Sequence, residues 1–132
     1  MSDIGENDLR EAARQGSVIR ARDDDGRGRI HASVIRAHCR NSAHETDPRG
    51  LRIEGAVLTG GLDLSAMRLV FPLSFDDCEF EQALHLDGAE LHSLRIHDCV
   101  LPGLLANGVN VRRDLDLSQW LRHRRRNGPF HR

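Results

Sequence analysis

The chain has 132 residues, of which 39% are hydrophobic, 4% are aromatic and 30% are charged, and its formal net charge is −1. This length allows one domain with a small core of aliphatic side chains. The three scattered cysteines exclude a disulfide framework, and no apolar run is long enough for a membrane-spanning helix. The polar first residues lack the basic and apolar blocks of a secretion signal, so we expect a cytoplasmic protein.

Charge is distributed unevenly along the chain. Residues 1–49 balance nine acidic residues against nine arginines, whereas residues 50–118 carry eleven acidic residues and five arginines. The remaining tail carries five arginines and no acidic residue. All basic residues apart from histidine are arginines, which is typical of a GC-rich genome such as that of an actinobacterium.

Residues 1–29 have little to bury. The run from Asp8 to Arg14 has the composition of one or two helical turns, but the acidic and glycine-rich run from Asp23 to Arg29 offers no apolar face. We therefore predict a mostly disordered N-terminal segment over 1–29.

Residues 30–48 are expected to form a capping helix and a loop. Ile30, Val34 and Ala37 share one face of a short amphipathic helix, with Ile35 beside them. The polar stretch that follows ends in Asp47-Pro48-Arg49-Gly50, which predicts a turn into the next segment.

Residues 49–118 contain an apolar-x-apolar triplet that returns every five or six residues. In each triplet the two outer side chains point to the same face of an extended strand. The last residues of the triplets are the anchors, at positions 53, 58, 64, 69, 75, 80, 86, 91, 96, 101, 106, 111 and 117. This period fits neither amphipathic helices nor hairpins.

Four triplets make a coil of 20 to 22 residues, which arranges the first triplet residues in columns. The columns are Leu51, Leu73, Leu94 and Leu115; Ala56, Cys78 and Cys99; Leu62, Leu84 and Leu104; and Met67, Ala89 and Val109. This register also predicts ion pairs between neighbouring coils, Arg68 with Glu90 and Arg95 with Asp116.

The best local matches to a known pattern are residues 55–58, 87–91 and 98–101, where the sequence resembles the Ala-(Asp/Asn)-Leu motif of the pentapeptide-repeat family. The resemblance implies an all-β solenoid, a right-handed four-sided parallel β-helix of about three coils behind a short N-terminal capping helix. The chain departs from the family pattern in its six-residue steps and in its large Leu or Met at every second small position. It is also similar to actinobacterial proteins in which a degenerate repeat follows a short helical segment.

The repeat contains no motif for catalysis, cofactors or metals, and we expect none of the three. Cys78 and Cys99 are predicted to be small buried hydrophobic residues, with a redox pair as the alternative. His85, His92 and His97 are expected at outward or corner positions, and Cys39 has no neighbour at metal-ligand spacing. Similar chains carry an oxidoreductase label, sometimes with membrane segments, but this sequence has no nucleotide, flavin or haem motif.

Four aspartates are expected at corners of the coils, namely Asp76, Asp77, Asp87 and Asp98. Some pentapeptide-repeat proteins present an acidic rod that mimics DNA and binds a topoisomerase, and by this resemblance the four residues are a candidate partner surface. The opposing interpretation is that they are turn-forming, solvated residues on a short repeat interleaved with arginines.

The basic tail over 119–132 ends the repeat abruptly, as a truncated reading frame would. It has a single Trp and no alternation of basic and aromatic residues, which argues against direct nucleic-acid binding. We expect a non-enzymatic scaffold or protein-interaction module. A protein partner or a second copy would dock at the open C-terminal end of the repeat, near Trp120.

Overall fold

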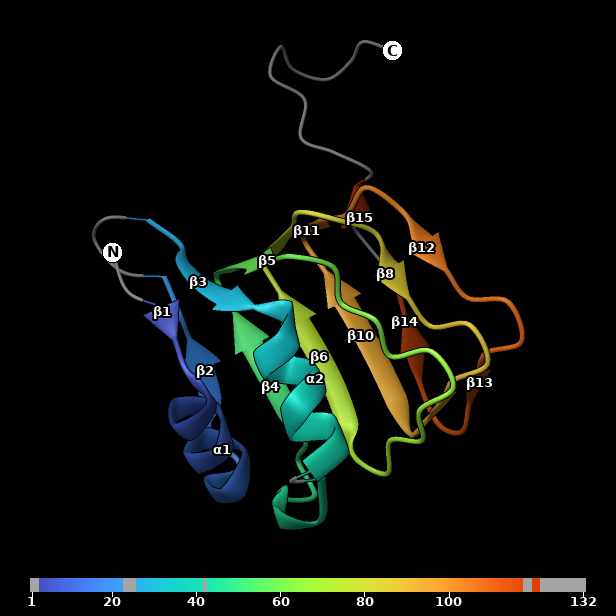
Figure 1. Ribbon diagram of the computed structural model, residues 1–132, viewed down its shortest axis with the longest axis horizontal. Coiled ribbons are helices and arrows are strands. Elements are labelled where there is room, and N and C mark those ends of the chain that lie inside the picture. Colours follow the sequence, from blue (N-terminus) through green and yellow to red (C-terminus); the bar gives the residue numbers. More distant parts are fainter. Residues whose placement is uncertain (1–2, 23–25, 42, 118–119, 122–132) are drawn as a thin grey trace, which may run out of the picture.

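The apolar triplets form short parallel β-strands that stack coil upon coil (Figure 1). The computed structural model describes residues 3–22, 26–41, 43–117 and 120–121. These residues form a parallel β-solenoid of about three coils, preceded by two helices. The elements are β1 (Asp3–Ile4), α1 (Glu6–Gln15), β2 (Val18–Arg20), β3 (Gly28–His31), α2 (Ala32–Asn41), a 3-10 turn (Ala43–Glu45), β4 (Leu51–Glu54), β5 (Ala56–Thr59), β6 (Pro72–Asp76), β7 (Glu79–Phe80), β8 (Leu84–His85), β9 (Glu90–Leu91), β10 (Ser93–His97), β11 (Cys99–Val100), β12 (Leu104–Leu105), β13 (Asn110–Val111), β14 (Leu115–Asp116) and β15 (Trp120–Leu121).

Each full coil passes through four ladders. One long sheet has the order β1-β3-β5-β7-β11-β15 and the other has the order β14-β10-β6-β4-β2. The remaining two ladders pair β8 with β12 and β9 with β13, and single bridges from Asp63 to His85 and from Arg68 to Glu90 extend them by one coil. All of these pairings are parallel, which agrees with the solenoid predicted from the repeat.

The predicted register is confirmed strand by strand. Leu73 pairs with Leu51 on one side and with Leu94 on the other, and Leu94 pairs with Leu115. The predicted ion pairs also form: Arg68 Nε lies 3.2 Å from a Glu90 carboxylate oxygen, and the corresponding distance from Arg95 to Asp116 is 3.7 Å. Both pairs are exposed, so each contributes well under about 1 kcal/mol.

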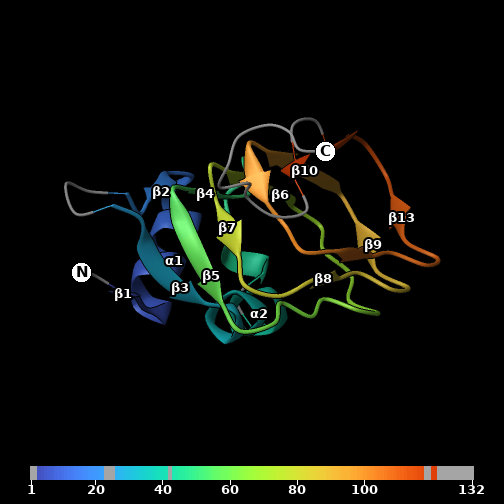
Figure 2. The same ribbon diagram turned by 90° about the horizontal axis from the view of Figure 1, so that it is seen from above.

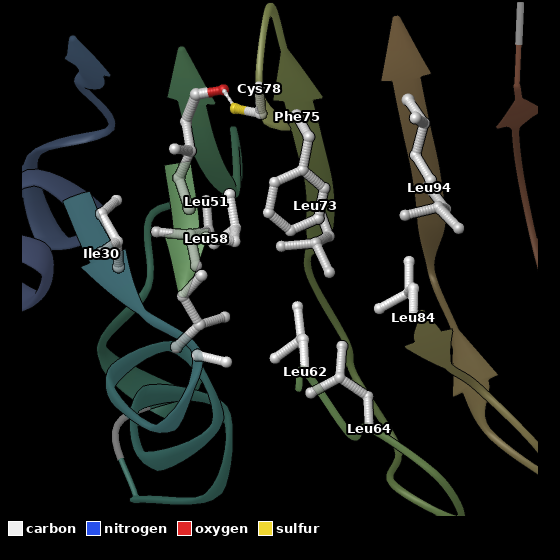
Figure 3. Packing of buried hydrophobic residues seen from close by; sticks show 14 of the residues in the cluster. Ile30, Leu51, Leu58, Leu62, Leu64, Leu73, Phe75, Cys78, Leu84 and Leu94 are labelled. Carbon is white, nitrogen blue, oxygen red and sulfur yellow. Dashed lines mark hydrogen bonds between the residues drawn. The ribbon is translucent and has the colours of Figure 1, made fainter. Parts of the chain in front are cut away.

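The interior of the solenoid is built from the anchors and the first triplet residues. All ten anchors from Ile53 to Leu101 are buried, and Phe75 packs edge-on against Phe80 with ring centroids 5.0 Å apart. Figure 3 shows Leu51, Leu73 and Leu94 on successive strands of one sheet. The core therefore consists of ordered columns of aliphatic side chains, as the low aromatic content requires.

The prediction of a mostly disordered segment over 1–29 is wrong for its described residues. There α1 buries Leu9 and Ala13, one helical turn apart, and ends at Gly16 in the left-handed conformation at φ +73°. The strands β2 and β3 add themselves in register to β4 and β5. A few apolar residues are enough to order this segment, because they pack against the apolar side chains and pair with the strand edges of the repeat.

The single capping helix predicted from Ile30 begins two residues later and has a different buried face. Ile30 is buried in β3, which pairs with β5 as far as His31, and α2 starts only after this ladder ends. The helix buries Ala32, Ile35, His38 and Cys39, whereas the predicted face residues Val34 and Ala37 are half-buried. The predicted turn before the repeat is confirmed by a hydrogen bond of 2.8 Å from Gly50 N to Asp47 O.

The two helices occupy the place that short strands take in later coils. The chain runs from β1 through α1 to β2 and from β3 through α2 to β4, whereas later coils cross the same gap on the two short ladders. Figure 2 shows α1 and α2 at the end of the solenoid opposite β13. At the N-terminal end, α1 and α2 thus replace the two short ladders, while β1 and β2 are the outermost strands of the two long sheets. At the C-terminal end, strands are present on all four sides.

Candidate functional site

Three of the four predicted corner aspartates lie at one corner of the solenoid. Asp76 is the last residue of β6 and Asp77 follows it, while Asp98 occupies the same position as Asp77 one coil later. Asp77 and Asp98 both have φ +56°, in the left-handed region that Gly55 occupies one coil earlier. Aspartate tolerates this conformation better than most residues, so it can turn the chain between the two long sheets. We call Asp76, Asp77, His97 and Asp98 the acidic corner.

Within the acidic corner, the carboxylate of Asp77 is held by two arginines. Arg22 lies 2.8 Å from Asp77 Oδ2, and Arg27 donates to Asp77 Oδ1 at 2.7 Å and to its backbone carbonyl at 3.0 Å. The Arg27 side chain is only 15% exposed. Asp77 therefore attaches Arg22 and Arg27, which lie between β2 and β3, to the corner between β6 and β7.

These contacts determine how Asp77 titrates. Burial of the carboxylate opposes its ionisation, but hydrogen bonds from Arg27 and Arg22 outweigh burial and lower the pKa of Asp77. A lowered pKa in the folded state means that the ion pairs stabilise the fold above the ordinary aspartate pKa. This contribution is lost as the pH falls through the lowered value.

We expect Asp77→Asn to lower the free energy of unfolding by about 1 kcal/mol at pH 7, a modest value because the side chain is 37% exposed. The difference from the wild type should shrink in acid, where Asp77 is protonated in both states of the wild type. Urea unfolding at pH 7 and in acid measures it. Asp114→Asn, at an exposed position in the last coil, is the control and should change little at either pH. An equal loss at both pH values would contradict the ion-pair explanation.

The other three residues of the acidic corner face one another. Asp76 and His97 are register neighbours on β6 and β10, and His97 Nδ1 lies 3.5 Å from Asp76 Oδ1 and 4.0 Å from Asp98 Oδ2. That nitrogen is inaccessible to solvent and has no hydrogen-bond partner. The sequence indicated His97 only as an outward residue, because its neighbour Asp76 is 21 positions away and comes close only through coil stacking.

The remaining predicted contact residues lie elsewhere. Asp87 sits between β8 and β9, where its carboxylate accepts a hydrogen bond of 2.8 Å from Asn107 N. Trp120 belongs to β15 and pairs with Cys99, but its side chain lies outside the described residues. Asp87 thus lies at a different corner of the coil from Asp76, Asp77 and Asp98.

The predicted column of cysteines is present, and its thiols are buried. Cys78 and Cys99 are free and point into the core, where each donates to backbone carbonyls of its own and the preceding coil at 3.3 to 3.6 Å. The adjacent Cys99 thiol and burial raise the pKa of Cys78. Burial likewise raises the pKa of Cys39 to about 12. The hydrogen bond with the Cys78 thiol instead lowers the pKa of Cys99. All three cysteines are buried, as expected for small core residues.

The last coil is much less buried than the ones before it. Leu115 is 53% exposed, although the leucines in register with it are 1% exposed. Several further inward residues of this coil are only partly buried, namely Leu104, Ala106, Val109, Val111 and Leu117. In the described part of the chain, β12, β13 and β14 are also the outermost strands of their ladders. We call this surface the C-terminal end.

No family model, curated protein or solved structure matches the chain. Among the described residues, no helix is long and apolar enough to cross a lipid bilayer.

Proposed function

We propose that this chain is a non-enzymatic β-helical scaffold that binds other proteins through its C-terminal end, and that it binds a second copy of itself in this way. The C-terminal end offers apolar side chains and unpaired strand edges. A partner can bind such a surface by adding a strand to the edge or by packing its own apolar side chains against it.

The observation that carries the proposal is the loss of burial along one column of leucines. Leu51, Leu73 and Leu94 are each 1% exposed, and the register places Leu115 in the same column at 53% exposure. Leu115 is the fourth and last member of this column among the described residues. A partner that covers Leu115 would bury apolar area at about 25 cal/mol per Å².

Backbone edges support the same surface. The strands β12, β13 and β14 are paired on the side of the preceding coil, and no described strand pairs with their other side. Unpaired N–H and C=O groups at such an edge are a template for another strand. A second copy presents the same edges and the same apolar column, so it can pair with the unpaired backbone groups and cover the exposed apolar side chains at the same time.

Leu115→Glu is expected to abolish self-association, because it places a charge in the apolar contact. The wild type should show a concentration-dependent dimer in sedimentation velocity at micromolar concentrations, and the variant should remain a monomer. Val70→Glu is the matched control, because Val70 is also an exposed apolar residue at 64% but lies in the first full coil. It should associate like the wild type.

Two results would contradict the proposal. One is a wild-type chain that stays monomeric up to high concentration. The other is a Leu115→Glu variant that is folded by circular dichroism and still associates as strongly as the wild type.

We also propose that the solenoid belongs to the pentapeptide-repeat family in a degenerate form. Four ladders per coil and the fully buried small residues Ala56, Cys78 and Cys99 in one column support this assignment. A sequence profile built from relatives of this chain tests it. The assignment fails if the five-residue steps of that profile do not align with the Ala-(Asp/Asn)-Leu pattern.

A further inference from the structure

The geometry points to a binding site for a divalent transition-metal ion at the acidic corner, with Asp76, His97 and Asp98 as its ligands. This site is separate from the C-terminal end and does not depend on self-association. Within the residues that the structure describes, it is the one group of three side chains whose potential ligand atoms all lie within 4.8 Å of one another.

The backbone holds these three residues in fixed positions. Asp76 and His97 close the ladder between β6 and β10 as register neighbours, so their outward side chains lie next to each other. Asp98 is the next residue, and its left-handed conformation at φ +56° makes the turn that leaves its carboxylate beside the imidazole. Ligands that come from a stacked ladder and a tight corner need little ordering when an ion binds.

The imidazole nitrogen gives an independent indication of a ligand. His97 Nδ1 is shielded from solvent and lacks a hydrogen-bond partner, and its distance of 3.5 Å from Asp76 Oδ1 is too long for a hydrogen bond. A shielded nitrogen beside two carboxylates is satisfied either by protonation of the imidazole or by a cation bound between the three groups. Ligands of one tetrahedral ion at ~2.0–2.2 Å lie ~3.3–3.6 Å apart. The distance of 3.5 Å from His97 to Asp76 fits this spacing, and the distance of 4.0 Å from His97 to the exposed Asp98 would shorten when an ion binds.

The surrounding charges leave the site negative. Arg22 and Arg27 are engaged by Asp77, and Arg20 lies 3.2 Å from Glu54. In the described chain no arginine forms an ion pair with Asp76 or Asp98. With a neutral imidazole, the site therefore carries two negative charges that a divalent ion would balance.

The donor set indicates the class of ion. One imidazole nitrogen and two carboxylate oxygens suit Zn²⁺, Co²⁺ or Mn²⁺ better than the all-oxygen ions Mg²⁺ and Ca²⁺. Asp98 is 60% exposed and provides an entry from solvent. A hollow of about 120 Å³ shares Asp76 with the site, and its charged lining residues are Arg52, Glu54, Asp76 and Arg95. Three protein ligands leave room for water or a further ligand.

Titration of the purified full chain with Co²⁺ and Zn²⁺ tests the site. We expect one ion per chain by calorimetry, visible absorption bands of Co²⁺ with nitrogen and oxygen ligands, and weaker binding of Ca²⁺. His97→Ala should reduce the affinity at least ~10-fold. Asp98→Asn should weaken binding similarly while keeping the corner intact, because asparagine also tolerates the left-handed conformation.

The matched control is His85→Ala. His85 pairs across coils with Asp63 in the way that His97 pairs with Asp76, but no third potential ligand belongs to that pair. The affinity of the His85→Ala variant for Co²⁺ should equal that of the wild type. The proposal is overturned if the wild type binds no Co²⁺ at millimolar concentration. It is also overturned if folded His97→Ala and Asp98→Asn variants bind as tightly as the His85→Ala control.

Discussion

Phe75→Ala is expected to lower the free energy of unfolding by about 3–5 kcal/mol. Phe75 is fully buried, contacts Phe80 edge-on, and lies in register between Ile53 and Ile96 of the neighbouring coils. The chain has four Phe and no Tyr, so few other side chains can fill the cavity that the substitution would leave. A loss of this size is a large part of the stability of a small domain.

Urea unfolding followed by circular dichroism measures this loss. The neighbouring outward residue provides the control, because Ser74→Ala should stay within about 0.5 kcal/mol of the wild type. If the two substitutions change the midpoint equally, Phe75 does not occupy the core position that the register assigns to it.

Gly50→Ala is expected to destabilise the fold by about 3 kcal/mol or more. Gly50 has φ +86°, where a side chain is strained, and a Cβ atom there would lie 2.1 Å from the backbone oxygen of Pro72. That oxygen belongs to the first residue of β6, so the chain can relieve the clash only by moving the strand that follows in the stack. The effect therefore combines local strain with disruption of pairing between β4 and β6.

Gly88→Ala separates the two contributions. Gly88 also has positive φ, at +70°, but the nearest atom to an added Cβ is Ala66 Cα at 4.0 Å. Ala66 makes the equivalent corner one coil earlier with φ +60°, so alanine is already accepted in that conformation. We expect a loss of about 1 kcal/mol for Gly88→Ala in the same thermal or urea unfolding measurement. Equal losses at Gly50 and Gly88 would show that backbone strain alone explains both.

The repeat was predictable because its register has few alternatives. A shift of one residue would turn every anchor outward, so the apolar triplets determine which residues stack. Two further predictions follow from this register, and both are confirmed. They are the column from Leu51 to Leu115 and the ion pair between Arg68 and Glu90.

The N-terminal segment was not predictable in the same way. Leu9 and Ala13 are the only fully buried residues of α1, too few for a periodic signal over ten residues. Asp77 and Arg27 are fifty positions apart, and their contact depends on how β3 adds to the edge of β5. The pairing of Asp76 with His97 likewise requires the stacking of coils before the two residues can be recognised as neighbours.

The replacement of short strands by α1 and α2 has a consequence for how copies can assemble. A stack with strand edges at both ends could add copies head to tail without limit and form a fibre. Here the two ends offer different edges, because β1 and β2 are edge strands of the long sheets at the N-terminal end, whereas the two short ladders have an outer strand only at the C-terminal end. A head-to-tail contact would therefore leave β12 and β13 without partners. In an isologous contact between two C-terminal ends, the outer strands of both copies are buried against each other. We therefore expect assembly to stop at two chains.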